Sequence, residues 1–469
     1  MFYGRAAELN ALADLYHRPK GGLVVVYGRR RIGKSTLIKQ FAKDKNALKF
    51  EGLEKQPTSA QIEHFSNELK NQLKENHLLQ KANFEAWPEL FDFLTEYMRG
   101  LKSDKKVILV FDEFQWMAAS QSKLVALLKF YWDRHWKDLN VMLILCGSIA
   151  SFMVKKVIRS KALYGRVSLS LRVDKLLPRD AKLMLRKRSE SETLKYLMLL
   201  GGVPKYLEAI DQSKSFEQNI EKLLFSPNSF FFGEFEKIFY SHFREPGFYL
   251  KIVRALIDGP KSQSELAAIL EAPSGGGMSE YLENLTMAGF IRIETPFLSH
   301  PQTKIRKFKI ADEYLMFYAK FLQKNERLIQ GGSGAVLFRS KILKSWDSWL
   351  GLSFESFCTA NALILAEAMG FRDKVLNFGP MFARGVGGYQ IDLLFERSDN
   401  IITLCEVKYH NKPVNTDIIP EVTKKAQTYK PPRGFSMEYA LIAPMGATLA
   451  LKKSAFFHHI VMEQDIFET

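Results

Sequence analysis

The chain has 469 residues, of which 46% are hydrophobic, enough to bury the cores of about three domains. Its formal net charge of +16 at pH 7 favours a polyanionic partner, because clustered Lys and Arg side chains release the counterions condensed on nucleic acid. Its three cysteines include no C-x-x-C pair, which argues against a disulfide framework and a zinc site, so we expect a cytoplasmic protein.

A phosphate-binding loop is predicted directly after the apolar strand Leu23 to Tyr27. The segment Gly28-Arg29-Arg30-Arg31-Ile32-Gly33-Lys34-Ser35 fits G-x-x-x-x-G-K-[ST], and a helix opens at Thr36. The glycines let backbone N–H groups close on a phosphate, so Gly28, Gly33 and Thr36 are expected to bind ATP. Lys34 would bridge the β- and γ-phosphates, and the Ser35 hydroxyl would hold Mg²⁺.

A second apolar strand, Val107 to Phe111, ends in two acids. This is the pattern of a central parallel strand whose carboxyl end faces a ligand. Asp112 would hold Mg²⁺ through its water shell, and Glu113 would polarise the attacking water. The alternative is a strand that ends in a solvated acidic turn.

The next predicted strand, Val141 to Cys146, is followed by Gly147 and Ser148. Ser148 either senses the γ-phosphate or caps the following helix, and the sequence does not decide between these roles. The strand belongs to the longest uncharged run, Leu139 to Val154, which is shorter than the ~20 residues needed to cross a bilayer. We therefore predict a core strand and no membrane span.

Several short segments occur in the order found in prokaryotic AAA+/STAND-related ATPases, which the chain resembles. They are Phe2-Tyr3-Gly4-Arg5 with Glu8-Leu9, the phosphate loop, Asp112-Glu113-Phe114-Gln115, Leu163-Tyr164-Gly165-Arg166 and Gly201-Gly202-Val203-Pro204. The resemblance implies that Arg166 is an arginine finger or sensor, acting in cis or from a neighbour in a homo-oligomer. It also implies that Pro204 packs near the nucleotide within a lid. The alternative for Arg166 is a surface or phosphate-backbone arginine.

A basic stretch runs from Lys155 to Arg188. It contains Lys155, Lys156, Arg159, Lys161, Arg172, Arg179, Lys182, Arg186, Lys187 and Arg188. Such a run either follows a nucleic-acid backbone or forms solvated helix faces, and both remain open. This stretch lies in the first predicted domain, residues 1–240, a P-loop ATPase with a helical lid.

Residues 241–330 are predicted to form a winged helix-turn-helix. One helix ends at Asp258-Gly259-Pro260, a second covers Ser264 to Leu270, and a third covers Met278 to Ala288 before a strand begins at Phe290. Three short helices followed by a β-ribbon are the element order of a winged helix.

The charges of this second domain favour two different roles. The return strand of its ribbon carries cations that suit DNA phosphates: Lys304, Arg306, Lys307 and Lys309. The third helix instead carries Glu280 and Glu283, which favour a protein–protein or lid role over base readout.

The third predicted domain, residues 331–469, follows a break at Gln330 to Gly334. Asp392 and Glu406-Val407-Lys408 have the form D…E-x-K on two strands joined by a polar hairpin. Alternation along a strand puts Glu406 and Lys408 on one face. Two carboxylates there could bind Mg²⁺, and Lys408 could orient a nucleophile or stabilise developing charge.

This pattern resembles the PD-(D/E)XK nuclease superfamily. An upstream helix supplies Glu355 where that superfamily often has a further acid, and the resemblance implies that Glu355, Asp392 and Glu406 are metal ligands. Asp392 follows Gln-Ile instead of Pro, which departs from the motif without removing a ligand. Acids at the ends of an ordinary hairpin remain the alternative.

The predicted architecture is an α/β P-loop NTPase with a parallel sheet, a winged helix-turn-helix and a restriction-nuclease-like α/β domain. The predicted function is binding and hydrolysis of ATP, with DNA binding and Mg²⁺-dependent cleavage under nucleotide control. The alternative is a STAND-type ATP-gated switch or scaffold whose C-terminal domain binds without cleaving.

Overall fold

The computed structural model describes residues 2–101, 106–118, 123–243, 245–294, 297, 306–383 and 389–469. Lys304 of the predicted ribbon lies outside these residues. The chain divides into two compact units, which we treat separately. Unit 1 comprises the chain up to Lys175 together with Ile238–Pro246 and Glu283–Gly289, and unit 2 comprises Leu176–Lys237, Gly247–Leu282 and Phe290–Thr469.

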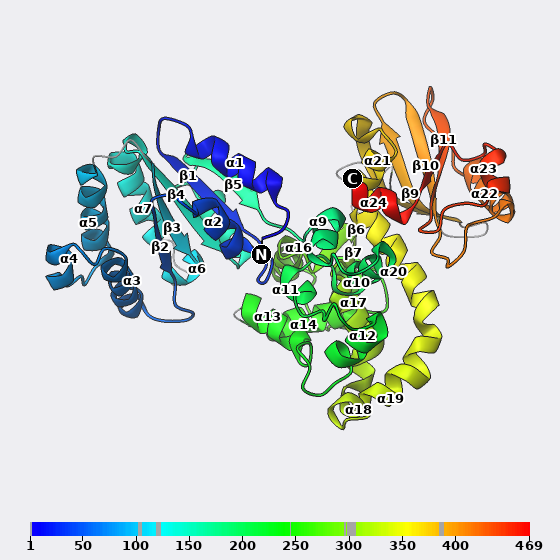
Figure 1. Cartoon of the computed structure of the whole chain (residues 1–469), viewed down its shortest axis with the longest axis horizontal. Coiled ribbons are helices and arrows are strands. Elements are labelled where there is room, and N and C mark those ends of the chain that lie inside the picture. Colours follow the sequence, from blue (N-terminus) through cyan, green and yellow to red (C-terminus); the bar gives the residue numbers. More distant parts are fainter. Residues whose placement is uncertain are drawn as a thin grey trace. The chain divides into compact units, whose positions relative to one another are not determined.

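Unit 1 is built on a five-stranded sheet in the order β2-β3-β4-β1-β5 (Figure 1). The strands are β1 Gly22–Tyr27, β2 Ala47–Glu51, β3 Val107–Asp112, β4 Val141–Gly147 and β5 Val167–Arg172. Every neighbouring pair is parallel, so the carboxyl ends of all five strands lie at one edge of the sheet. The predicted parallel α/β sheet is confirmed, and the buried central strands explain the continuous apolar runs in the sequence.

Helices connect these strands and complete the core. They are α1 Ala6–Tyr16, α2 Lys34–Ala42, α3 Thr58–Gln72, α4 His77–Lys81, α5 Trp87–Gly100, α6 Phe114–Met117, α7 Lys123–Arg134 and α8 Ala150–Phe152, with a 3₁₀ turn at Trp136–Asp138 and a π-helical turn at Met153–Ile158. Aromatic rings join α3 and α5 to β2 and β3: Phe50 stacks on Phe65 at 3.8 Å, and Phe91 stacks on Phe111 at 6.1 Å. This packing supports the end of β3 that carries the two predicted acids.

The first part of unit 2 is helical. Its elements are α9 Pro178–Met184, α10 Glu190–Leu200, α11 Pro204–Leu207, α12 Phe216–Leu224, α13 Glu234–His242, α14 Pro246–Ala255, α15 Gln263–Ile269 and α16 Gly276–Met287, with α13, α14 and α16 crossing between the units. An antiparallel ribbon follows, made of β6 Ile291–Glu294 and β7 Lys307–Ile310. The predicted order of three short helices and a two-stranded ribbon is therefore present.

The predicted break at Gln330 to Gly334 is a packed turn and not an open linker. It joins α18 Glu326–Gln330 to α19 Gly334–Leu337. A Cβ on Gly334 would lie 1.9 Å from the carbonyl oxygen of Phe225, so glycine allows a close approach of two backbones there. The prediction of a flexible break was wrong because a cluster of glycines does not distinguish a linker from such a close approach.

The remaining elements of unit 2 lead into a second five-stranded sheet. The helices are α17 Glu313–Phe317, α20 Trp346–Ala360, α21 Ala362–Ala368, α22 Ile419–Thr428, α23 Leu449–Lys453 and α24 Glu463–Glu468, with π-helical turns at Tyr318–Leu322 and Phe338–Ile342 and 3₁₀ turns at Gln323–Asn325, Leu343–Ser345, Arg372–Lys374 and Thr416–Ile418. The strands are β8 Val375–Ala383, β9 Tyr389–Arg397, β10 Ile401–Val407, β11 Ser436–Ile442 and β12 His459–Val461.

This second sheet is mixed, in the order β12-β11-β10-β9-β8 (Figure 1). The pairs β8–β9 and β9–β10 are antiparallel, whereas β10–β11 and β11–β12 are parallel. The predicted hairpin between β9 and β10 is confirmed. Helix α22 connects β10 to β11, as a parallel pair requires a crossover.

Membrane-spanning potential is limited to one bent helix pair within the described residues. No single helix there is long and apolar enough to span a bilayer, and Gly334–Ala360 with Ala362–Ala368 meets the length and composition limits only as a pair bent by 78°.

Candidate functional sites: a nucleotide loop and a carboxylate cluster

The predicted phosphate loop lies between β1 and α2. Gly33 has φ 91°, and a Cβ on Gly28 would come within 2.2 Å of the Val173 carbonyl oxygen, so both positions need glycine. The Lys34 ammonium donates to the carbonyl oxygens of Gly28 and Arg29, both at 2.9 Å. Burial lowers the pKa of Lys34, while the charges of nearby acids oppose that shift.

A cavity of about 900 Å³ lies beside this loop. Its lining includes Phe2, Ser35, Thr36, Lys39 and Lys49. The volume is in the range of small-molecule sites, about 300–1,000 Å³. The loop and cavity together give space and hydrogen-bond donors for a nucleotide.

Asp112 lies at the end of β3, buried and beside the loop. Burial would raise the pKa of Asp112, but the Lys49 charge 3.1 Å away and hydrogen bonds from Cys146, Ser35 and Lys49 hold it below its ordinary value. The contact between Ser35 and Asp112 brings together the two groups predicted to hold Mg²⁺. A hydroxyl and a carboxylate are oxygen donors of the kind Mg²⁺ takes in nucleotide sites.

Glu113 has a left-handed backbone, with φ 48°, and its carboxylate joins a polar triad. The Ser148 hydroxyl donates to Glu113 Oε2 at 2.7 Å. Gln115 Nε2 donates to the same oxygen and to Ser148 Oγ, the latter at 3.2 Å. Both donors bind the same carboxylate oxygen, Oε2.

The structure therefore brings Ser148 to the predicted site through Glu113. Its alternative role as a helix cap is not realised, because the residue that caps α8 is Ile149. Gln115, in α6, joins this triad although the sequence pattern alone assigned it no role. Its position two residues beyond Glu113 was the available signal.

Arg166 is paired within unit 1 with Asp133 of α7. Its Nε and Nη2 donate to the two oxygens of Asp133 at 2.6 and 2.9 Å. This bidentate hydrogen bond raises the pKa of Arg166. In this conformation the guanidinium is occupied by Asp133, and an arginine-finger role stays a prediction. Pro204 begins α11 in unit 2, after the predicted Gly-Gly turn.

His242, the last residue of α13, lies against the phosphate loop and was missed from the sequence. Its Nε2 accepts a hydrogen bond from the backbone N–H of Arg30 at 3.1 Å, and its Nδ1–H donates to the Ile238 carbonyl at 2.7 Å. Burial and the charges of Arg29, Lys34 and Arg30 lower the pKa of His242 to about 3. No local motif marks such a residue, because it reaches the loop only through the tertiary fold.

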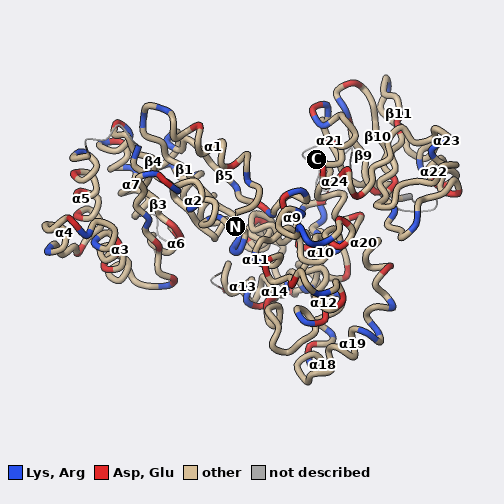
Figure 2. The backbone as a smooth tube through the Cα atoms, in the orientation of Figure 1, with Lys and Arg blue, Asp and Glu red and all other residues tan. Residues whose placement is uncertain are grey.

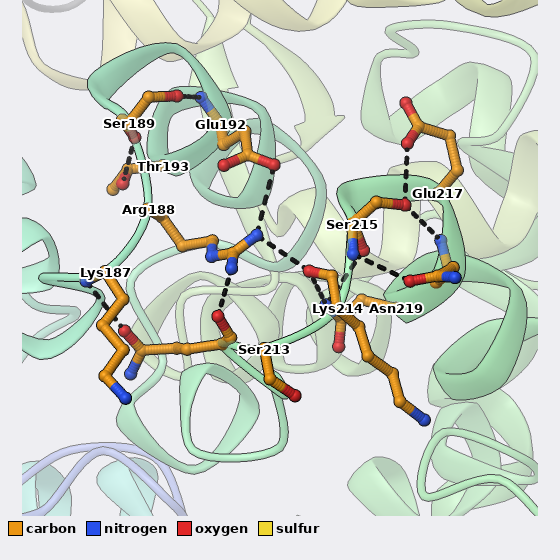
Figure 3. A network of polar contacts seen from close by, with 12 residues as sticks. Lys187, Arg188, Ser189, Glu192, Thr193, Ser213, Lys214, Ser215, Glu217 and Asn219 are labelled. Carbon is orange, nitrogen blue, oxygen red and sulfur yellow. Dashed lines mark hydrogen bonds and ion pairs between the residues drawn. The ribbon is translucent and has the colours of Figure 1, made fainter.

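The basic stretch from Lys155 to Arg188 is partly used for internal contacts. Lys155 and Arg159 pair with Glu283 at 3.0 and 3.7 Å. Figure 3 shows Arg188 joining the start of α10 to the segment before α12, where it donates to Glu192 Oε1 and to the Lys214 carbonyl. Arg188 also donates to the Gln212 carbonyl. Figure 2 shows acidic and basic residues interspersed along most elements. For Lys155, Arg159 and Arg188, these pairings favour a structural role over contact with a nucleic-acid backbone.

Unit 2 holds the second site, where β9 and β10 bring the predicted acids together. Asp392 Oδ2 accepts from the Val407 N–H at 3.2 Å, which ties the two strands at this point. Glu406 is fully buried, and Lys408 Nζ lies 2.9 Å from its carboxylate. The predicted pairing of Asp392, Glu406 and Lys408 is thus present. Glu355, from α20, lines the same cavity of about 580 Å³.

Helix α22 adds two residues to this cluster that the sequence pattern did not reveal. Lys425 Nζ lies 2.7 Å from Glu406 Oε2, and Glu421 lies 3.2 Å from both Lys408 and Lys425. Glu421 and Lys425 are four residues apart on one face of α22. This spacing predicts that they pair with each other, but it does not predict their contacts with residues of β10.

The three acids of the cluster share an unfavourable environment for negative charge. Burial raises the pKa of Asp392, Glu406 and Glu355, and mutual repulsion adds to the shift of Glu355 and Glu406. Hydrogen bonds from Lys425 and Lys408 oppose that shift at Glu406. Like charges held close together fit a cation, since Mg²⁺ is commonly bound by one or two carboxylates together with water and substrate phosphates. Within the described ranges, no three His, Cys, Asp or Glu side chains form a group that could hold a metal ion by themselves.

Two family models match the chain. One, described as an ATPase domain predominantly from Archaea, covers residues 2–210, and the other, described as archaeal and bacterial proteins of unknown function, covers residues 318–422. An uncharacterized protein of Methanocaldococcus jannaschii is 26% identical over 411 residues, 87% of this chain and 88% of that protein. An uncharacterized ATP-binding protein of the same organism is 44% identical over 45 residues, 10% of this chain and 76% of that protein.

Solved structures of ATPases also match. A Walker-type ATPase of Pyrococcus abyssi has a TM-score of 0.49 and 21% identity, covering 68% of this chain and 96% of that one. A STAND protein with a tetratricopeptide repeat sensor from Pyrococcus horikoshii has a TM-score of 0.31 and 18% identity, covering 79% of this chain and 51% of that one. At these TM-scores the likenesses carry no functional assignment. The family match and the phosphate loop carry it: residues 2–210 match the model of ATPase domains found predominantly in Archaea, and the protein is an ATPase.

Proposed function

We propose that this protein uses ATP binding and hydrolysis to control a Mg²⁺-dependent nuclease that acts on DNA. In this proposal residues 1–240 are the ATPase with its lid, residues 241–330 are a winged helix, and residues 331–469 are the nuclease domain. The observation that carries it is the meeting of Asp392, Glu406 and Lys408 at the ends of two paired strands, beside a solvent-accessible cavity.

The topology around those strands supports the proposal. Helix α20 precedes three antiparallel strands, β8 to β10, and α22 then crosses to the parallel strand β11. A helix, an antiparallel sheet edge and a crossover of this kind are what the restriction-nuclease resemblance implies. Glu355 on α20 faces the same cavity as the strand acids.

Each residue of the cluster has a role in phosphodiester cleavage. Asp392 and Glu406 would hold Mg²⁺ together with water and substrate oxygens, with Glu355 as an acid for the leaving group. The bound cation would neutralise the scissile phosphate and lower the pKa of a water molecule. Lys408, partly exposed beside Glu406, would hold that water or the developing negative charge.

In the ATPase site, the residues would bind the phosphates, hold Mg²⁺ and polarise water. Gly28, Gly33 and Thr36 would bind phosphates through backbone N–H groups, and Lys34 would move from the loop carbonyls to the phosphates. Ser35 and Asp112 would hold Mg²⁺, and Glu113 would polarise water. Ser148, Arg166 and Pro204 are proposed to respond to the γ-phosphate and to move the lid.

A second candidate function is an ATP-gated switch with a non-cleaving C-terminal domain. One observation favours it: Glu406 is already neutralised by two lysines, Lys408 and Lys425, which compete with a metal ion for its oxygens. In that case the acids stabilise the fold of the domain, and nucleotide state controls binding alone.

The experiment is a supercoiled-plasmid incubation with Mg²⁺, with and without ATP. It compares the parent with Lys34→Ala, Glu406→Ala and Lys408→Ala. We expect cleavage that disappears in Glu406→Ala and Lys408→Ala, and that loses its dependence on ATP in Lys34→Ala. DNA binding without cleavage in the parent and in every variant would reject the nuclease and favour the switch.

A further inference from the structure

The carboxylate cluster of unit 2 is one end of a longer trough. A cavity of about 610 Å³ extends from the cluster to the β6–β7 ribbon and is lined by residues of both. At the cluster end it contains Glu355, Gln390 and Asp392, which also line the cavity around Glu406 and Lys408. The two cavities therefore meet at these three residues, so the acids lie where the trough joins the cavity around Glu406 and Lys408.

The ribbon end of the trough is cationic. Its lining contains four basic residues, Arg292, Lys307, Lys309 and Lys320. Arg292 and Lys309 share a single acid, Glu294, at 3.0 and 3.5 Å, so one positive charge there is not neutralised. The exposed Lys320 ammonium makes no hydrogen bond or ion pair with any described residue. Lys309 is also close enough to Glu355 to lower its pKa, which connects the two ends electrostatically.

The lining of the trough also contains apolar side chains. They include Ile257, Met316 and Leu352, of which Leu352 is 63% exposed. Exposed apolar surface beside cations is the surface that accommodates a nucleobase next to its phosphate. A lining that holds both cations and apolar side chains, with carboxylates at its cluster end, suits a single strand, in which phosphates and bases alternate.

The size of the trough favours one strand over two. A volume of about 610 Å³ is that of a small-molecule site, about 300–1,000 Å³, and admits one or two nucleotides. A duplex presents its phosphates on a broad outer surface and is contacted by elements that enter its grooves. A cavity of this volume therefore favours one strand over both strands of a duplex.

We propose that this trough binds an unpaired strand of nucleic acid, with backbone phosphates on Lys309 and Lys320 and the scissile phosphate at the Mg²⁺ that Asp392 and Glu406 would hold. The proposal rests on the nuclease function proposed above and specifies its substrate: single-stranded segments, ends or flaps. The β6–β7 ribbon is then part of the substrate site, and not a separate duplex-binding wing.

The test measures binding without cleavage. Full-length protein in EDTA is titrated into a dye-labelled single strand of about 15 nucleotides and into its duplex, and anisotropy is recorded at several salt concentrations. The variants are Lys320→Glu and, as a matched control, Lys324→Glu, an exposed lysine four residues later that does not line the trough. Equal thermal midpoints check that both variants fold.

We expect the strand to bind about tenfold more tightly than the duplex, with about a tenfold loss in Lys320→Glu and a change within about twofold in Lys324→Glu. The slope of log K against log salt should fall in magnitude by about 0.7, because Lys320→Glu removes one phosphate contact by replacing a positive charge with a negative one. Equal or tighter binding of duplex, or equal losses in the two variants, would overturn the proposal.

The two proposals fail separately. If Lys320→Glu lowers strand binding while the parent and Glu406→Ala both leave DNA intact in Mg²⁺, the nuclease is rejected and the trough stands as a binding site. If cleavage depends on Glu406 while Lys320→Glu binds the strand as the parent does, the nuclease stands and the trough is rejected.

Discussion

The contact between His242 and the phosphate loop predicts a pH dependence of stability that one substitution should remove. Neutral His242 accepts the Arg30 N–H and donates to Ile238. All the charges that shift it, from Arg29, Arg30 and Lys34, are positive, and its pKa of about 3 compares with 6.5 for a free imidazole. Because the folded-state pKa is lowered, the folded state resists protonation and loses stability as pH falls from the free value toward the folded one.

The magnitude follows from proton uptake by the unfolded chain. Between about pH 7 and about pH 5.5 the unfolded imidazole becomes largely protonated, and the folded one does not, so the free energy of unfolding should fall by about 1.3 kcal/mol from this group alone. His242→Gln keeps an acceptor for Arg30 and a donor for Ile238 but does not titrate. Urea unfolding of the full chain is monitored by tryptophan fluorescence at both pH values. The free energy of unfolding should depend less on pH in the variant than in the parent. Identical pH dependences in parent and variant would refute the assignment of His242.

Three further predictions concern turnover and packing. Lys34→Ala should lower kcat for ATP hydrolysis by about a hundredfold or more, because Lys34 is the one lysine of the phosphate loop. The assay measures phosphate release. Unchanged turnover would contradict the assignment of Lys34 to the phosphates. Gln115→Ala should lower kcat by about tenfold to a hundredfold, because Gln115 orients the Glu113 carboxylate. The Kd for nucleotide, measured by calorimetry, should not change. An equal loss of affinity would argue for a role in binding instead. Gly334→Ala should destabilise the chain by about 1–3 kcal/mol in urea unfolding, because its Cβ would lie 1.9 Å from a backbone carbonyl, whereas Gly351→Ala, with nothing within 4 Å, should not.

The elements that carry chemistry were predictable where a short sequence contains the whole pattern. The phosphate loop follows β1, and the acids Asp112 and Glu113 follow β3, because apolar runs of this length form buried parallel strands. The hairpin that brings Asp392 next to the end of β10 was predicted correctly, because antiparallel strands joined by a short turn place such residues side by side. The three helices and ribbon after residue 245 were predicted in the correct order, since turns and helical periodicity are local signals.

The amino-acid sequence by itself therefore determined which chemically active side chains stand at each strand end. The partners of those groups were decided by the tertiary structure: Lys49 for Asp112, Asp133 for Arg166, Lys425 for Glu406 and His242 for the phosphate loop. Each partner comes from a different element, at a sequence distance that no periodicity encodes. Burial then sets the strength of each pairing, because charge interactions grow as water is excluded, and only the folded chain excludes it.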